Sequence, residues 1–138
     1  MENSNHFNVI VIGAGISGIG AGYYLKKNCP NKSFCIIEGR ENIGGTWDLF
    51  KYPGIRSDSD MFTLGYAFKP WKEQKTIANG PSILSYLEET VEENNLREKI
   101  KFSHKVLSAN WNSAERNWEV RAAHHEQEIL LTANFLFM

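Results

Sequence analysis

Three glycines near the amino terminus have the type and spacing that bind a pyrophosphate. Gly13, Gly15 and Gly18 follow the pattern G-x-G-x-x-G within the stretch VIVIGAGISGIGAGYYL. In such a pattern the first glycine permits a tight turn, the second leaves room for the phosphates, and the third lets a helix lie close to a strand. The amino terminus of that helix offers unpaired N–H groups and the positive end of its dipole to the phosphates.

An acidic residue lies at the distance expected of a ribose ligand in such a site. Glu38 comes twenty positions after Gly18 and closes a second apolar run. Its carboxylate is placed to accept hydrogen bonds from the hydroxyls of an adenosine ribose, and it repels a 2′-phosphate. The site therefore fits FAD or NAD and does not fit NADP. The alternative is a glycine turn with a purely structural role.

A second glycine pair favours FAD over NAD. Gly44 and Gly45 are followed by Thr46 and Trp47. The glycines allow another close approach of backbone to ligand, and the tryptophan can pack beside a flat ring system. A plain NAD domain does not need this segment, although a glycine turn followed by a core tryptophan would explain the same four residues.

The elements that must position these residues form a βαβ unit. Residues 7–12 are an apolar run that predicts a buried strand, residues 16–28 have helical spacing and end before Pro30, and residues 33–38 predict a second strand. The predicted fold class is therefore α/β: a partial, Rossmann-like FAD-binding domain whose parallel sheet contains this unit.

The middle of the chain contains a long loop and one clear helix. Residues 39–54 show no periodicity, and ordered loops of this length are usually functional. Residues 61–68 are compatible with a strand or a short helix. Residues 81–94 predict an amphipathic helix, because Ile83, Leu84, Leu87 and Val91 share one face and four glutamates cover the other.

The last third of the chain predicts a small antiparallel β-meander followed by a final buried strand, residues 133–138. Its four short runs of alternating polarity are residues 100–104, 106–111, 117–123 and 128–132. We expect one domain in three parts. They are the βαβ unit with the glycine loops (1–54), the aromatic loop with the amphipathic helix (55–99), and the meander with the final strand (100–138).

Composition excludes several classes of partner. The 15 Lys and Arg residues and 16 Asp and Glu residues are scattered, so no nucleic-acid footprint is expected. No apolar run approaches the roughly 20 residues of a membrane span, and residues 1–8 lack the features of a signal peptide. The sequence predicts a soluble, cytoplasmic protein.

Cys29 and Cys35 are expected to be free thiols, and the four histidines lack metal-ligand spacing.

Three quoted stretches together resemble a known family. GAGISG, IIEGRENIGGTW and YPGIRSDSDMFTLGYAFKPW are similar to the N-terminal FAD-binding part of class B flavin monooxygenases. That family holds the Baeyer–Villiger monooxygenases and related N- and S-oxidising enzymes. The similarity runs from about Phe7 to the end of the chain and includes VLSANWNSAERNWEV.

The resemblance implies which residues hold FAD. The pyrophosphate would lie on the first glycine loop, the adenosine on residues after the second strand, and the path towards the isoalloxazine on the second glycine loop. These three groups are Gly13, Gly15, Ser17 and Gly18; Glu38 and Arg40; and Gly45, Thr46 and Trp47.

The resemblance also implies roles for residues further along the chain. Arg56, Asp58 and Asp60 match a segment that lies near the flavin and the nicotinamide, and Val106 would meet the adenine through its backbone. The alternatives are that Asp58 and Asp60 are turn or N-cap residues and that Val106 belongs to the core alone.

In this family NADPH reduces the flavin, which then takes up O₂ and delivers one oxygen atom to a ketone, an amine or a sulfide. The cofactor carries that chemistry, so no catalytic side chain is assigned.

A second G-x-G-x-x-G for NADPH and the Baeyer–Villiger linker fingerprint do not occur in this sequence. We therefore expect a truncated piece that binds FAD weakly or not at all, has no enzyme-like NADPH turnover and can self-associate through an exposed sheet edge. A dinucleotide-binding module without turnover and an inactive fragment are the alternatives.

Overall fold

Strand β1 (His6–Ile12) lies inside a six-stranded sheet with the order β3-β2-β1-β6-β5-β4. The computed structural model describes residues 5–138. The other strands are β2 (Phe34–Ile37), β3 (Ile100–Lys101), β4 (His104–Asn112), β5 (Asn117–His124) and β6 (Gln127–Phe137). The helices are α1 (Ile16–Asn28), α2 (Thr46–Leu49), α3 (Met61–Leu64), α4 (Gly80–Glu93) and the 3₁₀ turn η1 (Arg97–Lys99).

The predicted βαβ unit is confirmed. β1 and β2 are parallel neighbours, with Val9 opposite Phe34 and Ile12 opposite Ile37, and α1 connects them. β3 and β6 extend the parallel part on either side, while β4 and β5 are antiparallel. The molecule therefore has the mixed α/β, Rossmann-like sheet that the sequence predicts.

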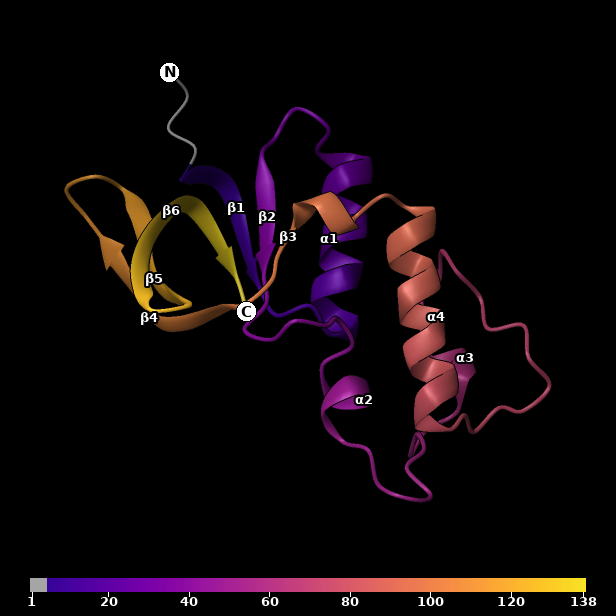
Figure 1. Cartoon of the computed structure of the whole chain (residues 1–138). Helices are drawn as coiled ribbons and strands as arrows, with labels where there is room; N and C mark the ends of the chain where they lie inside the picture. The colour runs from indigo at the N-terminus through magenta and orange to yellow at the C-terminus, as the bar shows by residue number, and fades with distance from the viewer. Residues whose placement is uncertain (1–4) are drawn as a thin grey trace.

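The two faces of the sheet are covered by different elements. Val11 and Ile36 point towards α1 and α4, which lie side by side on one face (Figure 1). The alternate residues Ile10, Cys35 and Ile37 are buried in a second cluster, together with side chains of β5 and β6. Successive side chains of a strand point to opposite faces, so each apolar run contributes to both cores.

The predicted amphipathic helix is confirmed as α4. Asn79 caps it, because its side-chain oxygen accepts a hydrogen bond from the N–H of Ser82 at 2.8 Å. Ile83, Leu87 and Val91 are buried. The segment whose periodicity left strand and helix open contains the one-turn helix α3, and the loop of residues 39–54 contains the one-turn helix α2.

The end of the chain differs from the prediction. The run 128–132 and the expected final strand join into the single strand β6, which pairs with β5 as far as Ala133 and with β1 from Thr132 onward. No turn residue separates the two runs. The carboxyl-terminal half has β1 as its one described neighbour, so Phe135 is 69% exposed, and the expectation of a buried strand there is wrong.

The start of the meander also differs from the prediction. The run 100–104 is divided, because Ile100 and Lys101 form β3 and pair in parallel with β2, whereas His104 begins β4 and pairs antiparallel with β5. Ser103 has a φ of 56°, which turns the chain between β3 and β4. The remaining runs pair as a meander, with the turn between β4 and β5 beginning after Asn112.

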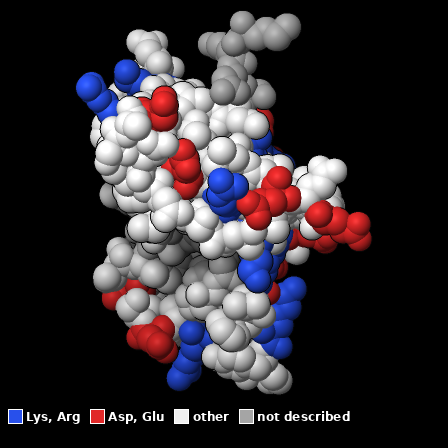
Figure 2. Space-filling view, turned by 90° about the vertical axis from the view of Figure 1, so that its left-hand side faces the viewer, with Lys and Arg blue, Asp and Glu red and all other residues white. Residues whose placement is uncertain are grey.

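Cys29 and Cys35 are both free, as expected. Burial raises the pKa of the Cys35 thiol to about 12, so this side chain is an inert part of the core at neutral pH. None of the helices in residues 5–138 is both long and apolar enough to cross a bilayer. Figure 2, which views the molecule from the side of the meander, shows acidic and basic side chains scattered among uncharged surface.

Candidate functional site

The first glycine loop connects the carboxyl end of β1 to α1. Gly13 has a φ of 97°, and its N–H donates to the carbonyl oxygen of Ile37 at 2.8 Å. A Cβ placed on Gly18 would lie 1.8 Å from the carbonyl oxygen of Gly13. The helix therefore packs directly on the turn, as the glycine spacing predicts.

The amino terminus of α1 is open for an anion. Gly15 is the N-cap residue, it makes no side-chain capping bond, and the first turn holds no acidic residue. Ser17 is exposed within this turn. The first N–H groups of a helix have no partner inside the helix, so the backbone here presents donors and the positive end of the helix dipole.

The second glycine loop lies against the first. Gly44 has a φ of 115° and its N–H donates to the carbonyl oxygen of Ala14 at 2.9 Å. A Cβ on Gly45 would lie 3.1 Å from the Cα of Gly15, so the two backbones meet without side chains between them. The loops that follow β1 and β2 lie at the same edge of the sheet (Figure 1). Both glycine loops border a cleft of about 300 Å³. The cleft is lined by Ile12, Gly13, Gly15, Ile16, Ser17, Gly18, Gly44, Gly45, Thr46 and Trp47.

Glu38 is a link between the loops as well as a candidate ribose ligand. It is 9% exposed, and its carboxylate accepts the N–H of Ala14 at 2.8 Å through one oxygen and the N–H of Arg40 at 3.0 Å through the other. Sequence reasoning missed these backbone contacts. Each carboxylate oxygen has a second lone pair, so bonds to ribose hydroxyls can be added to these two.

Arg40 lies beside the second glycine loop, where its side chain contacts Asp48. Its guanidinium donates to the carboxylate of Asp48 and lies 3.5 Å from the carbonyl oxygen of Gly45. Asp48 belongs to α2 and was missing from the sequence-predicted site. The available signal was a basic and an acidic residue on either side of a glycine pair, which is too common a pattern to single out.

Val106 lies on β4 close to Glu38. The N–H of His104 donates to the carbonyl oxygen of Glu38 at 2.9 Å, and a Cβ on Gly39 would lie 3.6 Å from the Cα of Lys105. The Val106 side chain packs against the core cluster of the meander. The start of β4 thus lies beside Glu38, one of the two residues proposed from the sequence to bind the adenosine.

An apolar cleft of about 510 Å³ adjoins the glycine cleft at Trp47, which lines both. Its other apolar walls come from the loop after α2 and from the start of α4. They are Phe50, Tyr52, Pro53, Ile55, Pro81 and Leu84. The first four residues of the segment YPGIRSDSDMFTLGYAFKPW, 52–55, therefore lie beside the second glycine loop.

The charged residues of that segment lie elsewhere. The Asp60 carboxylate caps α3 by accepting the N–H of Thr63 at 3.0 Å, which confirms the N-cap alternative for this residue. Arg56 is exposed and its backbone bridges to Asn79. Asp58 is exposed as well, and within the described part of the chain it lines neither the glycine cleft nor the apolar cleft.

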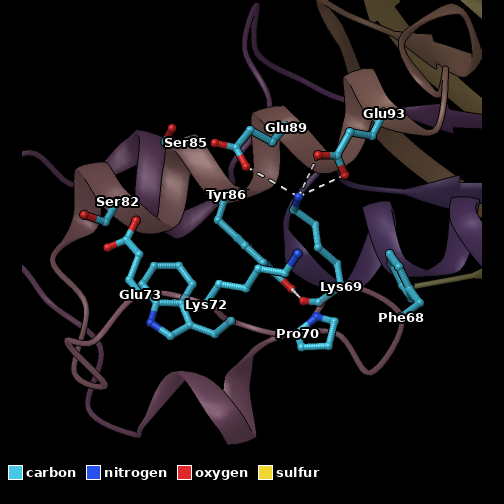
Figure 3. A pocket seen from close by; sticks show the side chains of 11 residues that line it. Phe68, Lys69, Pro70, Lys72, Glu73, Ser82, Ser85, Tyr86, Glu89 and Glu93 are labelled. Carbon is cyan, nitrogen blue, oxygen red and sulfur yellow. Dashed lines mark hydrogen bonds and ion pairs between the residues drawn. The ribbon is translucent and has the colours of Figure 1, made fainter.

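The last four residues of the same segment, 68–71, line a separate polar cleft of about 400 Å³ beside α4. Figure 3 shows the ammonium of Lys69 between the carboxylates of Glu89 and Glu93, at 3.4 and 2.9 Å. Although burial lowers the pKa of Lys69, the bonds and charges of the two glutamates raise it overall. The hydroxyl of Tyr86 donates to the Lys69 carbonyl at 2.6 Å. These polar groups partner one another, which is an arrangement that stabilises the loop.

A pair of stacked histidines near Glu38 makes stability depend on pH. The rings of His104 and His124 have their centroids 4.0 Å apart. Burial lowers the pKa of His104 below its ordinary value of 6.5, the charges of His124, Lys101 and His125 lower it further, and a bond to the Phe102 carbonyl opposes this. The unfolded chain therefore binds a proton on His104 at higher pH than the folded chain does. The contribution of His104 to the free energy of unfolding is complete above pH 6.5 and is lost as the pH falls through the lower pKa of the folded state.

We expect the melting temperature, followed by circular dichroism, to fall between about pH 7.5 and about pH 5.5. His104→Phe should reduce this dependence, because it removes the titrating ring and keeps the stacked shape. His6→Gln, at an exposed site on β1, serves as the control. The same pH dependence in His104→Phe and in the unchanged protein would contradict the assignment.

Comparisons with known proteins agree with the geometry. A family model described as an NAD(P)-binding Rossmann-like domain matches residues 11–73. The chain is 53% identical over 133 residues to the FAD-containing monooxygenase EthA of Mycolicibacterium smegmatis, covering 96% of this chain and 27% of that protein.

Two solved structures have the same fold. The open structure of cyclohexanone monooxygenase has a TM-score of 0.86 and 29% identity, and the match covers 96% of this chain and 26% of that one. The structure of OTEMO in complex with FAD and NADP has a TM-score of 0.82 and 30% identity, and the match covers 94% of this chain and 25% of that one. The chain thus spans about a quarter of the length of the proteins it matches.

Proposed function

Because the chain is a homologue of FAD-containing monooxygenases, we propose that it forms the FAD-binding portion of an NADPH- and O₂-dependent flavin monooxygenase. The enzyme as a whole would insert one oxygen atom into a small ketone, amine or sulfide. The observation that carries the proposal is the meeting of two glycine loops at the open amino terminus of α1. A cleft walled by backbone suits a phosphate-containing cofactor.

The residues that line the glycine cleft, together with Glu38, Arg40 and Val106, which do not line it, fit the parts of FAD. Gly13, Gly15, Ser17 and Gly18 would hold the pyrophosphate, because they offer N–H donors and no bulky side chain. Glu38, with Arg40 and the backbone of Val106, would hold the adenosine. Gly45, Thr46 and Trp47 would follow the cofactor towards its flat ring, for which the apolar cleft beyond Trp47 offers a dry surface.

The bound cofactor would supply the redox chemistry with NADPH and O₂. The residues of this chain would bind and orient it: the first loop would fix the phosphates, Glu38 would fix the ribose, and the apolar cleft would keep water from the ring.

Asp58 remains a proposed contributor near the nicotinamide. We also place the protein in the cytoplasm, in accord with its scattered charges and paucity of apolar runs, and propose self-association through the exposed edge of β6.

A second candidate is a dinucleotide-binding module without turnover. It is favoured by the first glycine loop and Glu38, which by themselves specify the binding of a dinucleotide and not its use. Both candidates predict ligand binding at the same cleft and no NADPH turnover by this chain alone, so NADPH consumption by the whole enzyme separates them.

Titration of the protein with FAD tests the proposal. We expect weak, saturable quenching of tryptophan fluorescence, with a smaller response to NADP⁺ because Glu38 repels a 2′-phosphate. Trp47→Phe should lose much of the quenching, whereas Trp118→Phe, on β5 outside the cleft, should keep it. The absence of saturable quenching and of any FAD-dependent rise in melting temperature would overturn the proposal. Binding of FAD without NADPH oxidation is the result that both candidates predict for this chain alone.

A further inference from the structure

We propose that Asp48 is a positioning residue, which acts through Arg40 to hold the second glycine loop at the separation from the first that a dinucleotide requires. The part of this inference that concerns FAD rests on the proposed function. The part that concerns the loops rests on contacts within the chain.

The contacts form a closed ring of hydrogen bonds that joins the two glycine loops. The Ala14 N–H donates to one oxygen of Glu38 at 2.8 Å, and the Arg40 N–H donates to the other at 3.0 Å. The Arg40 guanidinium reaches across to the carboxylate of Asp48 and the carbonyl of Gly45. The Gly44 N–H donates to the Ala14 carbonyl at 2.9 Å and closes the ring. The path from Asp48 through Arg40 and Glu38 to Ala14 therefore ties the second loop to the first independently of the direct bond from Gly44 to Ala14.

The second glycine loop needs such a restraint. Gly44 and Gly45 have no side chains to pack, and glycine loses more conformational freedom than other residues when it is ordered. The helix that follows has four residues and no side-chain cap, so it is too short to be stable by itself. Contacts to residues outside the loop must hold it in place.

Asp48 is placed to provide that contact. Its side chain is 12% exposed, so the interaction with Arg40 is partly shielded from solvent. Lys51 also faces Asp48, but at 3.7 Å and with a side chain that is 70% exposed, which makes it a weak partner. Arg40 is thus the cation through which Asp48 acts, and its remaining N–H groups are those available to the adenosine.

Hydrogen exchange of the protein without cofactor tests the ring directly. In Asp48→Ala and in Arg40→Met we expect the Gly44 amide to exchange about ten-fold faster or more, because its loop opens more often. Asp48→Glu should retain most of the protection. Lys51→Met is the matched control and should leave it unchanged. The amide of Ile10, in the sheet, reports whether each variant is folded. Unchanged protection of Gly44 in folded Asp48→Ala would overturn the inference.

Ligand binding tests the consequence for the cofactor. Asp48→Ala should weaken FAD by about ten-fold and weaken AMP by a smaller factor, because AMP meets Arg40 but does not extend to the second loop. The double variant Arg40→Met/Asp48→Ala should bind FAD no more weakly than Arg40→Met alone, because both changes break the same link. If the unchanged protein binds no FAD, the proposed function fails while the Gly44 measurement still decides the inference. Equal FAD affinity in Asp48→Ala and the unchanged protein would overturn the positioning role.

Discussion

Gly18→Ala is expected to destabilise the fold by about 3 kcal/mol, at the upper end of what overpacking usually costs. The added Cβ would lie 1.8 Å from the oxygen and 2.9 Å from the carbon of the Gly13 carbonyl. Both are backbone atoms of the turn that leaves β1, and the turn is tied to β2 by the bond from Gly13 to Ile37. Relief of the clash must therefore move α1 away from the sheet. Urea unfolding followed by circular dichroism measures the effect.

The control for this prediction is Gly39→Ala. A Cβ at Gly39 would meet the Cα of Lys105 at 3.6 Å, which is ordinary van der Waals contact, so stability should change little. If the two variants unfold at the same urea concentration, close packing at Gly18 is not what the third glycine of the pattern provides.

Gly15→Ala is expected to weaken FAD binding strongly while it changes the stability of the fold little. Gly15 has a φ of −84°, which alanine adopts readily, and its Cβ would lie 3.6 Å from the Cα of Gly45. Stability should therefore change by no more than about 1 kcal/mol, the usual effect at an N-cap position. The methyl group would nevertheless lie between the two glycine loops, where the proposed pyrophosphate meets the backbone. FAD affinity should fall by about 100-fold, which corresponds to about 2.7 kcal/mol.

Isothermal titration with FAD and urea unfolding, performed on the same preparation of Gly15→Ala, measure the two quantities together. Thr46→Ala, at an exposed position on the rim of the cleft, provides a variant that enlarges the cleft without blocking it. Retention of the original FAD affinity by Gly15→Ala would show that the cofactor does not pass between the two glycine loops.

Local patterns were sufficient for much of the fold. The apolar runs before Gly13 and Glu38 and the helical spacing after Gly15 predicted β1, β2 and α1, because each signal lies within a few residues of the element that it specifies. The glycine spacing predicted the close packing of α1 on the turn for the same reason. The amphipathic pattern of residues 81–94 predicted α4 equally well.

The sequence by itself thus determined the βαβ unit, the first glycine loop and the helix α4. The tertiary structure alone decided what depends on contacts between distant segments: that β3 joins β2, that β6 spans both parts of the sheet, and that Asp48 meets Arg40. It also divided the segment YPGIRSDSDMFTLGYAFKPW between an apolar cleft beside Trp47 and a polar cleft beside α4. The physical reason is that periodicity and turn chemistry act between near neighbours in the chain, whereas strand order and loop contacts follow from the packing that buries the most apolar surface.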